Sequence, residues 1–144
     1  MKVKVKKLDA RATLPTYGSE QAAGADLYTL TDGNLTIGAG ETAMIGTGLA
    51  LEIPAGYVGL VYARSGLATK KGLAPANKVG VIDSDYRGEI KVALYNQSGV
   101  PQTIAAGERI AQLVIAPYLT ADYEEAEALS DSARGAGGFG STGK

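Results

Sequence analysis

The sequence predicts an all-β protein, and three of its features carry that prediction. The chain has 144 residues, 45% of them hydrophobic, which suits one domain with a core of its own. Its 20 glycines and 5 prolines disfavour helices, and it shows no long heptad pattern. Several segments instead alternate apolar and polar residues with the period of a strand. Together these features favour a sandwich or barrel of short strands.

The strands are expected where the alternation is clearest. It occurs in residues 2–8, 42–53, 58–62, 90–94 and 110–114, and turn residues separate these runs. In the first run Val3 and Val5 share the face that would point inward. In the longest run large apolar residues such as Ile45 and Leu51 lie on one face, and small residues lie on the other. Val58, Leu60 and Tyr62 repeat the pattern in the third run.

One short helix is expected at residues 65–71. Ser65 is predicted as its N-cap, helix-forming residues follow, and Gly72 is predicted to end it. The end of the chain is different, because residues 134–144 hold five glycines and cannot pack a core of their own. The predicted organisation is therefore one domain of residues 1–133 followed by a Gly-rich segment of residues 134–144.

Composition excludes several kinds of chemistry. The chain has no histidine and no cysteine, which removes Ser-His triads, cysteine nucleophiles, disulfides and zinc sites, so a general base must be Asp, Glu, Lys or Tyr. A net charge of −1 argues against a general attraction to nucleic acid or anionic membranes. Neither a signal peptide nor an apolar run of membrane-spanning length is visible, and we expect a cytoplasmic protein.

Residues 63–68 form a candidate phosphate site. They place Arg64, Ser65 and Gly66 at a predicted junction between a strand and a helix, where free N–H groups favour an anion. An ordinary helix start with a surface arginine is an equally good interpretation of this segment alone.

The Gly-rich end is a second candidate. Residues 138–144 match the letters of a phosphate-binding loop, but the Ser or Thr and the helix that must follow are absent. Phe139 is the only phenylalanine in the chain, and Arg134, Ser141 and Thr142 lie near it in the sequence. These residues suit a lid that becomes ordered over a nucleotide, and a disordered tail is the alternative.

Residues 79–88 are expected to form a hairpin with the strand that follows. Asp83 and Asp85 lie in its turn, and either could activate water in a chain without histidine, although acids in turns are usually solvated. Tyr86 at the same turn could offer a flat face to a sugar. Asp26 and Gln112 are single polar residues within apolar runs, so each is either a structural hydrogen-bonding group or a ligand contact.

Taken together, five segments closely resemble the motifs of the trimeric dUTP diphosphatases (dUTPases). The segments are residues 23–27, 63–68, 80–88, 107–114 and 134–143, in the order found in that family. The resemblance implies a homotrimer of jelly-roll-like β-barrel subunits that hydrolyses dUTP to dUMP and pyrophosphate with Mg²⁺, each active site drawing on three chains. Such an enzyme keeps uracil out of DNA and supplies dUMP for dTTP synthesis.

The resemblance also assigns roles to residues. Asp83 is the base for the attacking water, and Tyr86 lies under the deoxyribose. Uracil is bound by the main chain at Val81, Ile82 and Lys91 and by the Asn77 amide, and the phosphates by Arg64, Ser65, Gly66 and Gln112. Arg134, Phe139, Ser141 and Thr142 close the site, and Asp26 reaches the Mg²⁺ shell through water.

Two alternatives remain. The dCTP deaminases share this fold by resemblance but act on the base, and release of ammonia from dCTP would identify one. A binding or regulatory module on the same scaffold would use nucleotide only to switch a partner interface. The presence of Asp83 and of the Gly-rich end argues against a protein without activity.

Overall fold

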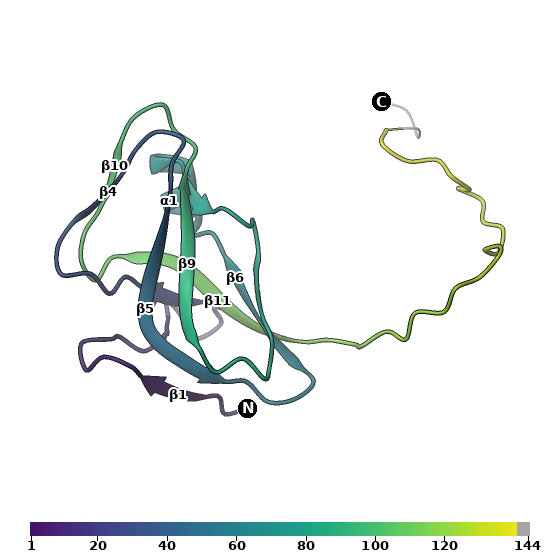
Figure 1. The fold of residues 1–144 in the computed structure, drawn as a ribbon, viewed down its shortest axis with the longest axis horizontal. Coiled ribbons are helices and arrows are strands. Elements are labelled where there is room, and N and C mark those ends of the chain that lie inside the picture. Colours follow the sequence, from purple (N-terminus) through teal and green to yellow (C-terminus); the bar gives the residue numbers. More distant parts are fainter. Residues whose placement is uncertain (141–144) are drawn as a thin grey trace.

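Two β-sheets and a two-stranded ribbon form the body of the protein (Figure 1). The structure, a computed structural model, describes residues 1–140. The four-stranded sheet has the order β1-β5-β9-β7, the five-stranded sheet the order β2-β3-β11-β6-β8, and the ribbon pairs β10 with β4. The elements are β1 (Lys4–Lys7), β2 (Thr16–Tyr17), β3 (Ala25–Tyr28), β4 (Leu35–Ile37), β5 (Thr42–Glu52), β6 (Tyr57–Tyr62), α1 (Ser65–Lys71), β7 (Leu73–Pro75), β8 (Gly80–Ile82), β9 (Glu89–Asn96), β10 (Gln102–Ile104) and β11 (Arg109–Pro117). The all-β prediction with one short helix is confirmed, and the sheets do not close into a continuous barrel.

The core lies between the two large sheets. Ile45 of β5 and Val92 of β9 belong to the same buried cluster as Leu27 of β3 and Leu113 of β11. The predicted strand faces hold in β5 and β9, where large apolar residues point inward. In β6, however, Val61 is the residue that packs in the core, so the apolar series at positions 58, 60 and 62 lies on the opposite face. Periodicity alone could not distinguish these faces, because both carry apolar residues.

A β-bulge in β5 shapes the middle of the four-stranded sheet. The register of β5 against β9 shifts between Gly46 and Ala50, and Gly48 within this interval has a φ of +67°. A Cβ atom at Gly48 would lie 2.5 Å from Cδ2 of Leu30 and 2.9 Å from Cβ of Ala12. Position 48 therefore requires glycine both for its left-handed backbone and for close packing.

The helix begins one residue earlier than a Ser65 N-cap requires. Arg64 is the N-cap, with an extended backbone, and its carbonyl accepts the N–H of Ala68 at 2.9 Å. Its side chain makes no capping bond, and Ser65 is already helical. The N-cap prediction was wrong because the arginine continues the extended backbone that leads out of β6. The predicted end is confirmed, since Gly72 has a φ of +66°.

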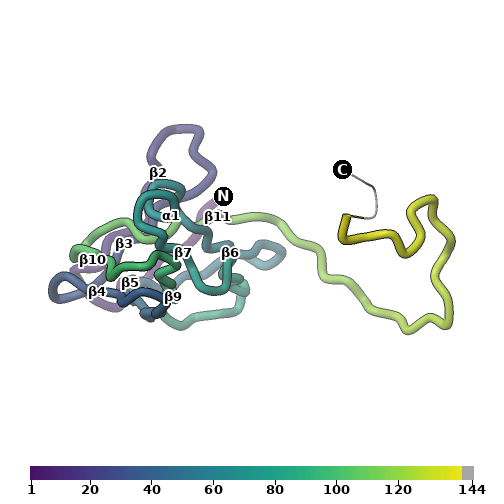
Figure 2. The backbone as a smooth tube through the Cα atoms, turned by 90° about the horizontal axis from the view of Figure 1, so that it is seen from above, coloured from purple at the N-terminus to yellow at the C-terminus, as the bar shows by residue number. Residues whose placement is uncertain are grey.

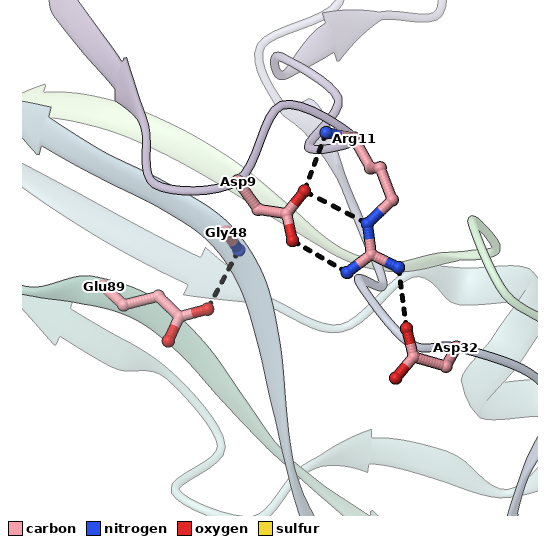
Figure 3. Close-up of polar contacts among 5 residues, drawn as sticks. All are labelled: Asp9, Arg11, Asp32, Gly48 and Glu89. Atoms are coloured by element: carbon pink, nitrogen blue, oxygen red, sulfur yellow. Dashed lines mark hydrogen bonds and ion pairs between the residues drawn. The ribbon is translucent and has the colours of Figure 1, made fainter.

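Arg11 ties the loop after β1 to the loop after β3 (Figure 3). Its guanidinium donates to Asp9 at 2.7 Å and to Asp32 at 2.7 Å. Hydrogen bonds from the side chain and the N–H of Arg11 lower the pKa of Asp9 to about 2, so this carboxylate stays ionised above that pH. All three side chains are solvent-accessible, and the cluster serves here as a surface link.

The chain leaves the body after β11. The N–H of Tyr118 still bonds to the carbonyl of Gly56 at 3.1 Å, and from there to residue 140 the chain forms no helix or strand and extends away from the sheets (Figures 1 and 2). Among residues 1–140, no helix is long and apolar enough to cross a membrane.

Gly48→Ala should destabilise the protein by about 3 kcal/mol, because strain at a left-handed position adds to the overlap with Leu30 and Ala12. The matched control is Gly40→Ala, at a φ of +73° with open space around it, which should cost about 1 kcal/mol. Urea unfolding of both variants measures the difference. Equal losses would show that packing at the bulge adds nothing.

Candidate active site

Two strands that follow one another in sequence, β8 and β9, enter different sheets. β8 pairs only with β6, and β9 pairs with β5 and, through residues 94–96, with β7. The predicted hairpin between them is therefore wrong in one respect, because within the described residues the two strands do not pair with each other. Within the described residues, β8 has no strand partner on the side away from β6, and residues 89–92 have none on the side away from β5.

A cavity of about 300 Å³ lies at these edges, and we call it the edge pocket. The pocket is lined by all six residues that the family resemblance assigned to the base, the sugar and the attacking water. They are Asn77, Val81, Ile82, Asp83, Tyr86 and Lys91. Asp83 lines the pocket and Asp85 does not, so the structure distinguishes two carboxylates that the turn pattern left equal.

Local hydrogen bonds hold the connection between β8 and β9 in shape. The N–H of Tyr86 donates to the carbonyl of Asp83 at 3.1 Å, and the Tyr86 hydroxyl donates to the carbonyl of Glu89 at 3.0 Å. The Glu89 carboxylate in turn accepts the N–H of Gly48 at 2.9 Å (Figure 3). The tyrosine ring is thus fixed at the pocket by the first residue of β9, which is itself fixed to the bulge of β5.

Glu89 and Met44 are among the lining residues of this pocket to which the sequence analysis gave no role. Glu89 follows the Asp-Tyr-Arg-Gly turn directly in the sequence. Met44 lines the pocket from β5, opposite Ala93 in the neighbouring strand. The sequence did offer one indication of a role for Met44, because it is a large residue on the small-residue face of the longest run, residues 42–53.

A second cavity, of about 240 Å³, lies where β6 leads into α1, and we call it the junction pocket. Five sequence-predicted residues line it, namely Asp26, Arg64, Ser65, Gly66 and Gln112, together with Gly18, Ala22 and Gly24. The register pairs Asp26 of β3 with Gln112 of β11, which places both side chains on the same face of the sheet. Gln112 Nε2 donates to the carbonyl of Ala63 at 2.8 Å, which anchors its amide beside the start of the helix.

The Asp26 carboxylate lies between two arginines. Arg64 Nε donates to its Oδ1 at 2.6 Å, and Arg109 Nη1 donates to its Oδ2 at 3.2 Å. The Asp26 side chain is only 12% exposed, so these contacts satisfy a carboxylate that water reaches poorly. The sequence analysis missed Arg109, although it lies within the fourth motif segment.

A second ion pair borders this group. Glu108 accepts the ammonium of Lys71 at 3.1 Å and the N–H of Ala105 at 2.8 Å. Partial burial raises the pKa of Glu108, but the N–H of Ala105 and the Lys71 ammonium outweigh it and hold the pKa below its ordinary value, with a further contribution from the Arg64 charge. Glu108 is therefore an ionised neighbour of the junction pocket.

Residues 134–140, the described part of the Gly-rich end, line neither pocket. Arg134 Nε donates to the carbonyl of Gly137 at 2.7 Å, and the Phe139 ring is fully exposed. Ser141 and Thr142 lie outside the described residues.

The fold and the two pockets define a protein suited to bind a nucleotide, with free backbone edges for a planar polar ring and arginine-rich surroundings for phosphates. Comparison with known proteins identifies it further. The family model for dUTPase matches residues 10–143, and the chain belongs to the dUTPase family of dUTP diphosphatases.

Relatives and solved structures agree with this assignment. The deoxyuridine 5'-triphosphate nucleotidohydrolase of Nautilia profundicola is 54% identical over the full length of both chains. That of Desulfitobacterium hafniense is 50% identical over 99% of this chain and 95% of its own. The dUTPase of Staphylococcus bacteriophage 80alpha with dUPNHPP has a TM-score of 0.91 and 31% identity over 99% of both chains. Resemblance on five short motifs and similarity over the whole chain thus indicate the same family.

Gly24→Ala should lower kcat/KM for dUTP by about tenfold, because a Cβ at position 24 would lie 2.3 Å from Oε1 and 3.2 Å from Cβ of Gln112. The anchored Gln112 amide would then have to leave its place in the junction pocket. Gly18→Ala is the matched control, since Gly18 lines the same pocket with open space around it, and it should leave the kinetics unchanged. Equal kinetics for the two variants would contradict this role of Gly24.

Proposed function

We propose that the protein hydrolyses dUTP to dUMP and pyrophosphate, with uracil and deoxyribose in an edge pocket and the triphosphate in a junction pocket. The observation that carries this proposal is the separation of β8 and β9 into different sheets beside Asp83. It leaves backbone groups without a strand partner beside a cavity that the Asp83 carboxylate also lines, and these groups can bind a base. The arginine, serine and glutamine side chains of the junction pocket supply hydrogen-bond donors and positive charge for the phosphates.

Uracil is recognised by main-chain groups of Val81 and Ile82 on one edge and of Lys91 on the other, with the Asn77 amide as an additional partner. A fixed pair of backbone edges favours a ring whose donors and acceptors match it, which discriminates against cytosine. The Tyr86 ring lies against the deoxyribose. Because its hydroxyl is held by the Glu89 carbonyl, the ring leaves no room and no partner for a ribose 2'-hydroxyl.

Asp83 acts as general base in the reaction. It takes a proton from a water molecule whose oxygen attacks the α-phosphorus, and the bond from that phosphorus to the bridging α,β-oxygen breaks as pyrophosphate leaves. No histidine is needed for this step. The arginine side chains stabilise the negative charge on the phosphate oxygens.

The site suits a Mg²⁺ ion that enters with the triphosphate. Among residues 1–140 no three acidic side chains group closely enough to hold a metal by themselves. Mg²⁺ commonly binds through substrate phosphates and water with one or two carboxylates, and Asp26 is the carboxylate of the junction pocket. When bound, the ion supplies neutralisation of phosphate charge.

The proposed assembly is a homotrimer with shared active sites. None of residues 1–140 lines both pockets, which is consistent with one site built from different chains. The five-stranded sheet carries Leu60, Tyr62 and Val114 on its outer face, where another subunit could cover them.

The segment after β11 supports the same assembly. Leu119, Tyr123 and Leu129 are 97%, 94% and 90% exposed, so this chain gives them nothing to pack on. Residues 122–131 contain five acidic and no basic residues, whereas residues 2–7, at the sheet edge formed by β1, contain four lysines. We infer that this segment crosses to a neighbouring subunit and brings Arg134, Phe139, Ser141 and Thr142 to its site as a lid.

The direct test of the proposed activity is pyrophosphate release from dUTP, dCTP, dTTP and UTP with Mg²⁺. We expect release from dUTP in strong preference to the other three. Ammonia release from dCTP would instead identify a deaminase, and nucleotide binding without turnover would identify a regulatory module.

Asp83→Asn should lower kcat for dUTP by about 10²- to 10⁴-fold and leave binding of dUPNHPP within a few-fold, because it removes the base but keeps the shape of the side chain. Asp85→Asn is the matched control, since this neighbouring exposed carboxylate does not line the edge pocket, and its kcat should be close to that of the unmodified chain. A larger loss in Asp85→Asn than in Asp83→Asn would assign the base to Asp85.

Deletion of residues 134–144 should leave the melting temperature unchanged and lower kcat, because the segment covers no core but completes the site. Mixing these chains with Asp83→Asn chains by refolding them together should restore part of the activity, since a hybrid can place an intact lid over an intact Asp83. No recovery would show that each lid acts on its own chain, and loss of folding after the deletion would contradict the lid role.

A further inference from the structure

The charge arrangement around Asp26 differs from an ordinary surface ion pair. One carboxylate, 12% exposed, accepts Arg64 Nε at 2.6 Å and Arg109 Nη1 at 3.2 Å, each on a different oxygen. The cluster of Asp26, Arg64 and Arg109 thus carries a net charge of about +1. Arg11 forms the opposite arrangement, with one cation between two anions, on an exposed surface (Figure 3), and none of these three residues lines either pocket.

The contact through Nε determines what Arg64 can still do. Among the described residues, Nε is the only nitrogen of Arg64 that donates a hydrogen bond. Its two terminal nitrogens remain for a ligand in the junction pocket, which Arg64 lines. A carboxylate held at Nε also prevents the guanidinium from rotating, so the direction of the free nitrogens depends on Asp26.

Arg109 reaches the junction pocket only through Asp26. It does not line the pocket, and its single described side-chain hydrogen bond is the one to Asp26 Oδ2. That bond fixes the second oxygen of the carboxylate, and the carboxylate plane then has one orientation toward Arg64.

We propose that Asp26 is a positioning residue that directs the Arg64 guanidinium at the triphosphate, and that Arg109 is a second positioning residue that acts through Asp26. This rests on the proposed placement of the triphosphate in the junction pocket. It gives Asp26 a function that does not require metal, in addition to the contact with the Mg²⁺ shell that the family resemblance implies.

Binding without metal tests the proposal. Isothermal titration calorimetry with dUPNHPP in EDTA would compare the unmodified protein with Asp26→Asn, Arg109→Gln and the double variant. We expect about tenfold weaker binding for Asp26→Asn and about threefold weaker binding for Arg109→Gln. The double variant should bind no more weakly than Asp26→Asn, within twofold, because Arg109 acts through the carboxylate that is already lost.

The matched control is Arg11→Gln, which removes an arginine from another ion cluster and should leave the affinity unchanged. Arg109→Lys keeps a cation for Asp26 and should recover most of the affinity that Arg109→Gln loses. This comparison also decides the role of Arg109 if Asp26→Asn does not fold, as judged by its melting temperature.

Three outcomes would overturn the proposal. They are normal binding by Asp26→Asn in EDTA with a defect only when Mg²⁺ is added, multiplication of the two single effects in the double variant, and equal affinities for Arg109→Gln and Arg109→Lys. Because binding is measured without turnover, these outcomes are separate from the pyrophosphate assay that tests the proposed function.

Discussion

The arrangement of this site depends on one constraint, which is that β8 and β9 cannot pair with each other while each completes a different sheet. Backbone N–H and C=O groups require partners, so two facing free edges form a surface that a polar ring can satisfy. The bulge in β5 sets the place of the second edge. There the Thr47 hydroxyl donates to the carbonyl of Ile90 at 2.7 Å, and Glu89 accepts the N–H of Gly48. These side chains replace ladder bonds at the bulge and thereby hold the start of β9.

Charge is organised locally, although the whole chain is nearly neutral. The net charge of −1 excludes a general field for anions, yet the junction pocket lies beside three cationic side chains, two of which share a single carboxylate. Ion pairs of this kind hold cationic side chains in fixed orientations at a partly buried site. This fixed orientation matters more for phosphate recognition than the total charge of the chain. Fixed cations of this kind also explain how a site with no histidine, and with no cluster of three acidic residues among residues 1–140, can still suit phosphoryl chemistry.

Several features could be predicted from residue patterns, and their limits are physical. The alternation in β5 and β9 identified inward faces, because most of the large apolar side chains of each strand lie on one face. It failed in β6, where Val61 is buried although positions 58, 60 and 62 are also apolar. Asn96 could not be foreseen either. It is fully buried, and its amide donates to the carbonyl of Ile37, which is 59 residues away in the chain, and to that of Val100, which is four residues away.

Composition and residue order are enough to establish the strand periodicity, the absence of histidine and cysteine chemistry, and the order of the short segments that carry the family resemblance. These depend on neighbouring residues or on composition alone. Three further features become visible in the folded chain: Asp83 rather than Asp85 lines a cavity, Arg109 shares Asp26 with Arg64, and β8 and β9 separate. Each of these depends on strand pairing between residues far apart in the chain. The alternating pattern of a strand is the same whichever strand it pairs with. It therefore does not indicate which pairing the folded protein adopts.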